Sequence, residues 1–243
     1  MKTCIIIPVY NHESVTKVVA QLKAFALPCF LVNDGSSLSC SKVLADCVDR
    51  ESSWLTLITR PENSGKGAAV VDGFKAALAA GYTHAIQIDA DGQHDVNAIP
   101  EFIAASNQFP DAMILGQPIF DESVPKSRLY GRKITNFWIT INVLSTAIAD
   151  GMCGFRVYPL AAVRKLISTT PIGQRMDFDI DIVVRLYWQG IKAINLRIIV
   201  CYPEDGVSHF RLWHDNLMIS KIHAKLFFGM LIRSPKLILR HWQ

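Results

Sequence analysis

The first 116 residues alternate short apolar runs with longer stretches of helical length, and this alternation restricts the fold more than any other feature. The apolar runs cover residues 4–9, 29–33, 55–59, 84–89 and 112–116. The helix-compatible stretches between them cover residues 13–25, 38–49, 67–80 and 96–107. This order is typical of βαβ units, whose parallel strands are apolar throughout because helices cover both faces of the sheet. We therefore predict an α/β fold with a mostly parallel, twisted sheet flanked by helices.

The second half of the chain is less regular. A basic stretch at 126–133 leads into an apolar, helix-like run at 134–149, and a strand-like segment follows at 154–158. Helical patterns at 160–167 and 177–189 precede a strand at 191–202, and the last segment, 215–243, is basic and amphipathic. Because no linker, repeat or low-complexity segment interrupts the chain, we predict one domain over residues 1–214 and a helical tail over residues 215–243.

The composition excludes several classes of protein. Half of the 243 residues are hydrophobic and 19% are charged, so the chain can bury a substantial core and does not resemble a disordered protein. The formal net charge of +4 is too small for a dedicated nucleic-acid binder, although it suits an anionic small molecule or an anionic membrane surface. We therefore expect no nucleic-acid partner.

The cysteines and the apolar segments indicate the compartment. None of the six cysteines belongs to a CxxC pair or a zinc-finger pattern, and the first residues, with four apolar residues before Pro8, do not resemble a signal peptide. Neither of the most apolar segments, 134–149 and 217–232, resembles a membrane span, because a span needs about 20 predominantly apolar residues. These features favour a reducing, cytoplasmic location.

Asp89 and Asp91 carry the strongest chemical signal. They follow a strand-like run, and neighbouring carboxylates there repel each other unless a cation or hydrogen bonds compensate, although a solvated acidic turn is also open. Mg²⁺ or Mn²⁺ is typically held by one or two carboxylates together with substrate phosphates. An EF-hand loop is excluded because Gly92 stands at the fourth position instead of the sixth, and a haloacid-dehalogenase motif because Gln93 stands where a hydroxyl belongs.

Two further polar segments follow strand ends. Asn33-Asp34-Gly35-Ser36 forms either an ordinary turn or a place where a carboxylate accepts hydrogen bonds from a nucleobase or ribose. Residues 60–69 lack the Walker P-loop pattern, but their glycines permit close approach of a ligand, while Lys66 and the helix N-terminus favour an anion. Because ligands bind beyond the carboxyl ends of strands in open α/β sheets, these segments predict a common binding crevice.

Four segments occur in order after successive strands: Pro8-Val9-Tyr10-Asn11, Asn33-Asp34-Gly35-Ser36, Asn63-Ser64-Gly65-Lys66-Gly67 and Asp89-Ala90-Asp91. Together they resemble the inverting family 2 glycosyltransferases, which have the GT-A nucleotide-sugar-binding fold. The likeness extends over residues 3–210. It is strongest to the branch that resembles dolichyl-phosphate-mannose synthase and uses polyprenyl-phosphate acceptors.

The resemblance implies roles for individual residues. Asp89 and Asp91 would form the family's metal-binding Asp-x-Asp, with Gln93 as a third oxygen ligand for Mg²⁺ or Mn²⁺. Residues 150–156 are similar to the family's D-x-x-S-G-F-R segment, with Cys153 in place of the hydroxyl residue and Arg156 near phosphate. The residues implied in binding the nucleotide sugar or the acceptor phosphate are Pro8, Tyr10, Asn11, Asp34, Lys66, Asp89, Arg156, Ser208, His209 and Arg211.

The resemblance also points to a general base within residues 178–181. Asp181 aligns with the family's acid and is the preferred general base, and Asp179 is the second candidate. Two residues at i and i+2 on a helix point about 200° apart, so at most one of the two carboxylates can face the cleft. Acids that only complement the dipole at a helix N-terminus are the structural alternative.

These implications define an expected reaction. A metal-dependent, inverting transferase would move a sugar from a UDP- or GDP-sugar to a hydroxyl, whose proton a base removes, or to a lipid phosphate, whose oxygen is already anionic. A nucleotidyltransferase acting on a sugar phosphate is one alternative, although Pro8-Val9-Tyr10-Asn11-His12 stands where its glycine-rich loop is expected. A non-catalytic nucleotide-sugar-binding protein at the membrane is the other, and it would not require the acidic residues.

The tail indicates a membrane contact. Against one acid, Asp215, it carries the basic residues Lys221, Lys225, Arg233, Lys236 and Arg240. Large apolar residues lie between them, and a basic amphipathic helix of this kind suits the headgroup boundary of an anionic membrane. We therefore expect a peripheral protein on the inner face of the cytoplasmic membrane, with a lipid or lipid-phosphate acceptor. Packing of the tail on the domain or in a homo-oligomer interface is the alternative.

Overall fold

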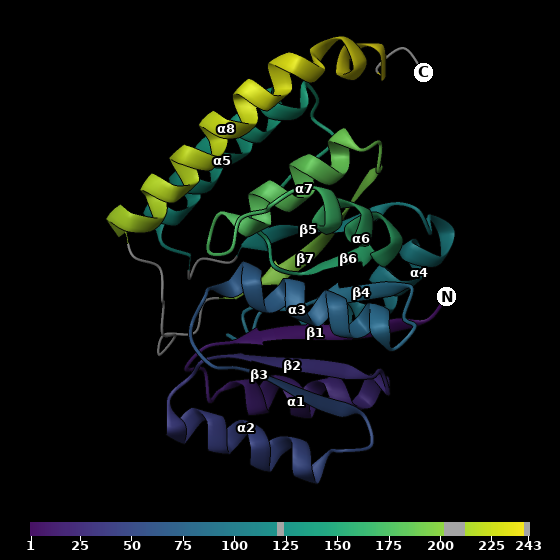
Figure 1. Cartoon of the computed structure of the whole chain (residues 1–243), viewed down its shortest axis with the longest axis vertical. Coiled ribbons are helices and arrows are strands. Elements are labelled where there is room, and N and C mark those ends of the chain that lie inside the picture. Colours follow the sequence, from purple (N-terminus) through teal and green to yellow (C-terminus); the bar gives the residue numbers. More distant parts are fainter. Residues whose placement is uncertain (121–123, 202–211, 241–243) are drawn as a thin grey trace.

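The computed structural model describes residues 1–120, 124–201 and 212–240, and these residues build one seven-stranded sheet with helices around it (Figure 1). The strands are β1 Thr3–Val9, β2 Cys29–Asp34, β3 Leu55–Arg60, β4 His84–Gln87, β5 Met113–Phe120, β6 Arg156–Pro159 and β7 Ala193–Val200. They lie in the order β3-β2-β1-β4-β6-β5-β7, and neighbours pair in parallel except that β6 runs antiparallel to β4 and β5. The predicted α/β fold with a mostly parallel sheet is confirmed.

Helices cover both faces of the sheet. They are α1 Val15–Leu22, α2 Leu38–Arg50, α3 Lys66–Ala79, α4 Ile99–Gln108, α5 Lys126–Val143, α6 Leu160–Thr169, α7 Phe178–Trp188 and α8 Leu212–Leu239, with short 3-10 helices at Lys23–Phe25 and Val96–Ala98. On β1, Ile6 packs in the core cluster that contains residues of α3, α6 and α7, whereas Ile5 and Ile7 pack in the cluster that contains residues of α1, α2 and α4. This two-sided burial explains why the strands are apolar throughout.

Three boundaries differ from the sequence-based expectation. β4 ends at Gln87, so the two aspartates that follow it lie in a loop. The helix expected over 134–149 is α5, which begins at Lys126 and ends where Leu144 adopts a left-handed conformation with φ of 50°. The basic stretch 126–133 therefore belongs to the same helix as the apolar residues after it. The last strand, expected over 191–202, is limited to Ala193–Val200.

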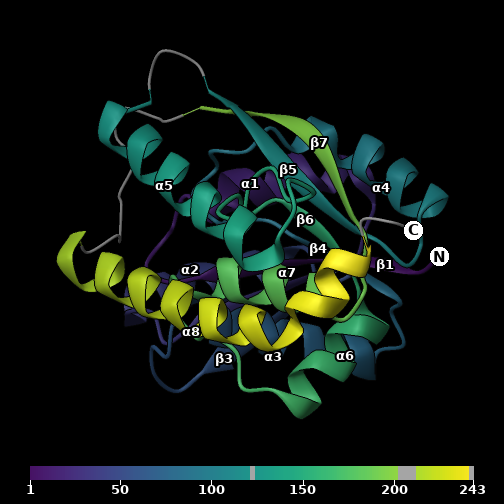
Figure 2. The ribbon, with the colours of Figure 1, turned by 90° about the horizontal axis from the view of Figure 1, so that it is seen from above.

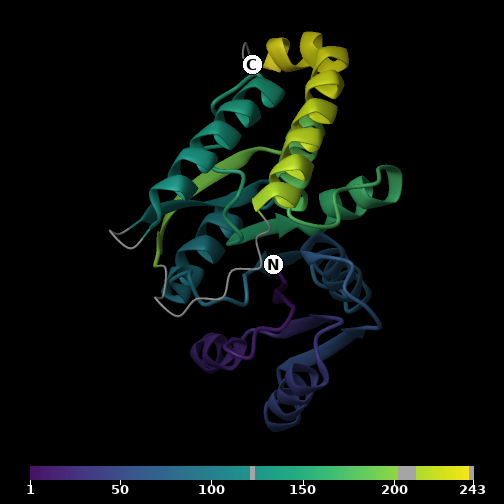
Figure 3. The same cartoon turned by 90° about the vertical axis from the view of Figure 1, so that its left-hand side faces the viewer.

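α8 packs against the domain along one face. Its buried residues Ile219, Ile222, Leu226 and Met230 follow helical spacing and belong to the same core cluster as residues of α5 and α7. α5 and α8 lie side by side above α7 (Figures 1 and 3). Their N-terminal ends are further apart than their C-terminal halves (Figures 2 and 3). Among the described residues, none of the helices combines the length and the hydropathy that a membrane span requires.

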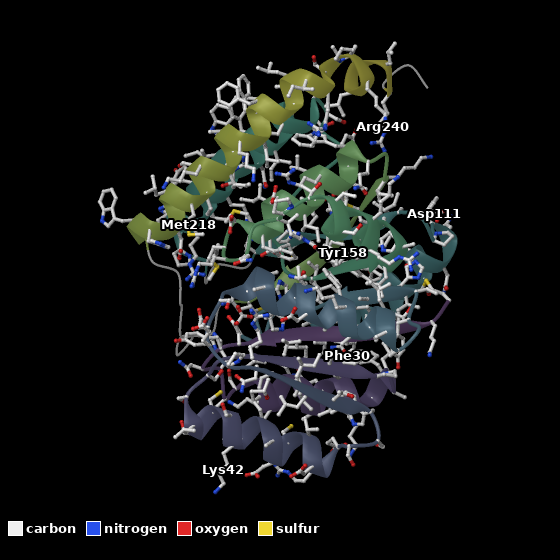
Figure 4. All side chains as sticks on the ribbon, in the orientation of Figure 1. Phe30, Lys42, Asp111, Tyr158, Met218 and Arg240 are labelled. Carbon is white, nitrogen blue, oxygen red and sulfur yellow. The ribbon has the colours of Figure 1, made fainter. Side chains whose placement is uncertain are left out.

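Two polar contacts fix the position of α8. Arg240, labelled at its far end in Figure 4, donates to the carbonyl oxygens of Tyr187 at 2.7 Å and Gly190 at 3.0 Å. His223 lies at the interface with α5, where its Nδ1 is 3.2 Å from Asn142 Nδ2. Burial lowers the pKa of His223 to about 4, so the imidazole stays neutral at ordinary pH. The tail thus shares its core with the domain, and the division at residue 214 stays a prediction.

Substitutions on the two faces of α8 test this packing. Leu226 is fully buried, whereas Phe228, two residues further on, is 66% exposed. We expect Leu226→Ala to lower the free energy of unfolding by about 2–5 kcal/mol, because it leaves a cavity in the core. Phe228→Ala should change it by only about 0.5 kcal/mol, as is typical of surface positions. Chemical denaturation measures both, and equal losses would contradict the packing described here.

Candidate active site

One cavity of about 380 Å³ lies at the carboxyl ends of the parallel strands, within the range of about 300–1,000 Å³ that is usual for ligand sites. Its lining includes residues at and directly after the carboxyl ends of β1, β2 and β4. Residues in the first turns of α3 and α7 also line it. The N-terminal parts of α5 and α8 complete its wall. The sequence-predicted residues that line the cavity are Pro8, Tyr10, Asp34, Lys66, Asp89, Asp91, Gln93 and Asp179.

Lys66 forms ion pairs with two carboxylates from distant parts of the chain. Its Nζ lies 2.8 Å from Asp89 Oδ1 and 2.7 Å from Asp179 Oδ2. Burial alone would lower the pKa of Lys66, but the charges of Asp179 and Asp89 outweigh it and raise the pKa above its ordinary value. Burial likewise raises the pKa of Asp89, but Lys66 and other positive neighbours bring it below its ordinary value. The ammonium group therefore ties the loop after β4 to α7.

The backbone of Gly154 lies against the carboxylate of Asp89. A Cβ at this position would overlap with both carboxylate oxygens, so only glycine allows Asp89 to lie where it does. The turn before Gly154 is fixed by Asp150, whose Oδ1 accepts from the N–H groups of Met152 at 2.9 Å and Cys153 at 2.7 Å. This close approach explains the glycine in the segment 150–156.

Asp91 and Gln93 lie in the loop after β4. Asp91 Oδ1 accepts from the Gln93 N–H group at 3.0 Å, and the Gln93 carbonyl accepts from the Cys201 N–H group at 3.0 Å, which joins the loop to the end of β7. Within the parts of the chain that the structure describes, Asp91 takes part in no ion pair. Its carboxylate thus faces the cavity outside any ion pair. The nearby imidazole of His94 stays positively charged, because Cys153, Asp89 and Asp91 outweigh the effect of burial and raise its pKa to about 9.

This donor set suits a hard divalent cation. Asp89, Asp91 and Gln93 offer oxygen ligands on one wall of the cavity. In residues 1–120, 124–201 and 212–240, no group of three or more His, Cys, Asp or Glu side chains could hold a metal ion by itself. A cation would therefore need phosphate oxygens as additional ligands, which is the usual way in which proteins bind Mg²⁺.

A buried network holds Asp179 from below. Its Oδ1 accepts from Gln87 Nε2 at 3.1 Å and lies 3.7 Å from Arg156 Nη1. Arg156 is fully buried and also donates to the Asp179 carbonyl at 2.8 Å and to the hydroxyl of Tyr158, a residue labelled in the interior in Figure 4, at 3.1 Å. The guanidinium of Arg156 thus positions Asp179 and does not line the cavity. This geometry does not favour the assignment of Arg156 to a substrate phosphate, which stays a prediction.

Asp181 lies outside this cavity. Its carboxylate is fully buried, pairs with Arg185 one turn further along α7 and accepts from the Gly173 N–H group at 2.9 Å. Burial raises the pKa of Asp181, and the charge of Arg185 acts against this rise. Because the two acids project from different sides of α7, only Asp179 faces the cavity. This placement favours Asp179 over Asp181, against the order predicted from the sequence, and the catalytic role of either residue stays a prediction.

Two residues predicted to bind the donor hold loops around the cavity. Asp34 is buried, accepts from the N–H groups of residues 64 and 65 at 3.1 and 2.7 Å, and lies 3.0 Å from Arg60 Nε. It still lines the cavity. Asn11 does not: it has a left-handed backbone with φ of 51°, and its Oδ1 accepts from the Ser37 N–H group at 2.8 Å. In this structure Asn11 joins two loops, and the substrate-binding role expected for it stays a prediction.

The glycine-rich turn before α3 packs against protein instead of a phosphate. Residues 173–178 lie directly on it, and a Cβ at Gly65 or Gly67 would overlap with them. The carbonyl of Gln174 also accepts from the N–H group of Ala68, in the first turn of α3, at 3.0 Å. The anion expected at this helix N-terminus is therefore not supported, because the segment 173–178 covers it.

The cavity also contains residues that the sequence did not connect with it: Arg128, Met152, Arg175, Met176, Ile180, His214 and Ile219. Arg128 belongs to the basic stretch before the apolar run, and His214 directly precedes the predicted basic tail. The positive charge of these two regions is the signal that the sequence offers. Their distance in sequence from the strand ends hides their relation to the site. Ser208, His209 and Arg211 lie outside the described residues, and their phosphate contacts stay predictions.

An acid-lined cavity at the strand ends of an α/β sheet is typical of nucleotide-binding enzymes. Residues 4–167 match the family described as Glycosyl transferase family 2, and the chain belongs to this family. It is a glycosyltransferase, so the alternatives of a nucleotidyltransferase and of a non-catalytic binding protein are set aside.

The chain is similar to proteins whose names refer to polyprenol phosphates. A polyprenol monophosphomannose synthase from Mycolicibacterium smegmatis is 25% identical over 213 residues, which are 85% of this chain and 80% of the relative. An undecaprenyl-phosphate mannosyltransferase from Micrococcus luteus is 24% identical over 222 residues, which are 86% of this chain and 87% of the relative.

Solved structures share the fold. A mannosyltransferase from Pyrobaculum calidifontis in complex with GDP-Man and Mn²⁺ superposes with a TM-score of 0.61 at 12% identity, over 96% of this chain and 64% of that chain. A glucosyl-3-phosphoglycerate synthase from Mycobacterium tuberculosis with Mn²⁺, UDP and phosphoglyceric acid superposes with a TM-score of 0.65 at 9% identity, over 94% of this chain and 78% of that chain. The fold is thus of the GT-A type.

Asparagine substitutions separate the two acids of α7. Asp179→Asn removes the charge that pairs with Lys66, so the ammonium and its other partner, Asp89, should shift within the site. We expect turnover to fall about 10²-fold or more, because small displacements of groups in an active site cost that much. Asp181→Asn should leave the turnover of the folded protein nearly unchanged and lower the free energy of unfolding by about 3 kcal/mol, since it breaks a buried ion pair. Steady-state kinetics and denaturation measure both. An inactive, fully stable Asp181→Asn variant would contradict the preference for Asp179.

Proposed function

We propose that this glycosyltransferase moves a sugar from a UDP- or GDP-sugar to a lipid phosphate, with inversion at the anomeric carbon and with a divalent cation on the donor diphosphate. The names of the relatives support a polyprenyl-phosphate acceptor. The solved neighbours hold GDP-Man or UDP together with Mn²⁺, which supports the donor class and a divalent cation. The cavity supports both the donor and the acceptor, because its lining combines carboxylates with basic and apolar side chains.

The polar wall suits the donor. Asp91, together with Asp89 and Gln93, would hold Mg²⁺ or Mn²⁺, which when bound neutralises the charge that develops on the leaving nucleoside diphosphate. Pro8 near the end of β1 and Tyr10 in the loop after it line the same cavity and would contact the nucleoside.

The pairing of both candidate bases is the observation that carries the acceptor assignment. Asp179 pairs with Lys66, and Asp181 lies outside the cavity paired with Arg185. Both carboxylate oxygens of Asp179 already accept hydrogen bonds, Oδ2 from Lys66 at 2.7 Å and Oδ1 from Gln87 at 3.1 Å, so neither is free to accept the proton of a hydroxyl. A phosphate oxygen is already anionic and needs no base. The site therefore suits a phosphate acceptor better than an alcohol.

The other wall of the cavity suits this acceptor. Arg128 and Arg175 line the cavity and bring positive charge, which attracts a phosphate, and Arg175 also donates to Asn63 Oδ1 at 3.1 Å. Met176, Ile180 and Ile219 are apolar, as the first carbons of a lipid require. In the proposed step, the acceptor oxygen forms a bond to the anomeric carbon as the bond from that carbon to the donor diphosphate breaks. The electron pair leaves with the nucleoside diphosphate, and a single displacement of this kind inverts the anomeric carbon.

An exposed apolar surface on α5 and α8 supports contact with a membrane. The rings of Phe137, Trp138, Phe227 and Phe228 follow one another across the two helices at centroid distances of 5.9–6.4 Å. Ile232, on α8, is 81% exposed. The N-terminal ends of the same helices line the cavity, so a lipid acceptor in the membrane would lie near its wall. We propose that the protein lies peripherally on the inner face of the cytoplasmic membrane. Self-association through this surface is the alternative.

A comparison of acceptors tests the reaction. With radiolabelled UDP- and GDP-sugars, we expect the full chain to label undecaprenyl phosphate and to leave undecaprenol unlabelled. EDTA should stop transfer, and Mn²⁺ should restore it. Asp91→Asn keeps the size of the side chain but removes its negative charge. This variant should lose transfer while its far-UV circular dichroism stays unchanged. Labelling of the alcohol, or full activity of Asp91→Asn, would contradict the proposal.

Vesicle flotation tests the membrane contact. We expect the full chain to float with anionic vesicles at low salt and to be released in part as salt rises, because salt screens the basic residues. The double variant Phe137→Ser with Ile232→Ser should float less. Leu38→Ser removes an equally exposed side chain from α2, at the opposite end of the molecule from α8 (Figure 1), and should float like the original chain. Equal flotation of all variants would exclude this surface.

A further inference from the structure

The two aspartates of the Asp-x-Asp motif have unequal surroundings. Asp89 lies 2.8 Å from the ammonium of Lys66 and against the backbone of Gly154, whereas Asp91 forms no ion pair among the described residues. One of the two carboxylates that would bind a divalent cation therefore already has a cation beside it. Sequence alone does not distinguish the two acids, because the charged partner of Asp89 comes from a distant segment of the chain.

The position of Lys66 is fixed by its backbone. It is the first residue of α3, and the preceding Gly65 has a φ of 105°, which only glycine adopts readily. Residues 173–178 pack directly on this turn, so the backbone cannot move away without disturbing the site. The side chain, by contrast, has four flexible carbons, is 16% exposed and lines the cavity. Its ammonium can therefore change partners while its Cα stays in place.

We propose that Lys66 is an internal counter-ion that keeps a divalent cation from binding tightly at Asp89 and Asp91 until a nucleoside diphosphate enters with it. The free enzyme is then held together by the ammonium, and the cation and the nucleotide bind as a cooperative pair. This inference rests on the proposed function, because it assumes that the site takes a metal and a nucleotide.

Electrostatics gives the reason. An ammonium and a divalent cation that share one carboxylate repel each other strongly at a separation of a few ångströms in a partly buried site. The described residues offer too few ligands to offset this repulsion, since no group of three or more His, Cys, Asp or Glu side chains among them could hold a metal ion. A diphosphate supplies both oxygen ligands and negative charge, which attracts the ammonium as well. Cation and nucleotide therefore increase each other's affinity by the same factor.

Calorimetric titration of the full chain with Mn²⁺, alone and with saturating UDP or GDP, measures this coupling. For the original chain we expect weak binding of Mn²⁺ alone and binding at least about tenfold tighter with the nucleotide that fits the site. Lys66→Met removes the ammonium, so Mn²⁺ alone should bind about tenfold or more tightly than to the original chain, and the coupling factor should fall. Lys66→Arg keeps the charge and should keep both values near those of the original chain.

Two controls accompany these variants. Lys75→Met removes an exposed lysine from the same helix, where it pairs only with Asp72 at 3.3 Å, and should leave Mn²⁺ binding unchanged. Lys66→Met with Asp179→Asn removes one positive and one negative charge together, so no carboxylate is left unpaired on α7 and the protein should stay folded. This double variant should show the same tighter binding of Mn²⁺ alone.

The outcomes distinguish the inference from the proposed function. If Lys66→Met and the double variant bind Mn²⁺ alone as weakly as the original chain, with the same coupling to the nucleotide, Lys66 is not the counter-ion and the inference is overturned, while the proposed function stands. If the original chain binds no Mn²⁺ with either UDP or GDP, the proposed function fails and the inference fails with it.

Discussion

One ammonium group between two carboxylates holds the site of this glycosyltransferase together. Lys66 begins α3, Asp89 follows β4 and Asp179 lies in the first turn of α7, so a single buried charge joins three elements from both halves of the chain. Charges buried without partners are costly, and the three groups are therefore stable only in one another's presence. Arg156 and Gln87 support the arrangement from below, since both contact the Asp179 carboxylate.

Glycines make this arrangement possible. Gly65 and Gly67 let residues 173–178 pack on the start of α3, and Gly154 lets the backbone approach the Asp89 carboxylate. Each of these glycines is part of a segment that the sequence offered as ligand-binding. In the structure, the missing side chain makes room for the protein itself, and these contacts shape the cavity that Gly65 and Asp89 line.

The layer of α5 and α8 connects the site with a surface. One face of each helix is buried against α7 and the core, and the other exposes aromatic and aliphatic side chains. The two helices begin at the cavity, where Arg128 and Ile219 line its wall. The same two elements thus contribute to the acceptor side of the cavity and to the apolar surface. This arrangement gives the basic, apolar tail a place in the proposed chemistry.

Hydrophobic periodicity alone determined the order of strands and helices up to β5, because burial on both sheet faces leaves a direct trace in the sequence. The ordered motifs likewise determined the family and the eight predicted residues that line the cavity, since parallel strands bring their carboxyl ends to one edge. Only the tertiary structure placed Asp179 at the cavity and Asp181 outside it, buried Arg156 beneath the site and brought the start of α8 to its wall. The physical reason is that the direction of a side chain, and its partner across the fold, depend on contacts between segments far apart in the chain, which no local pattern of residues records.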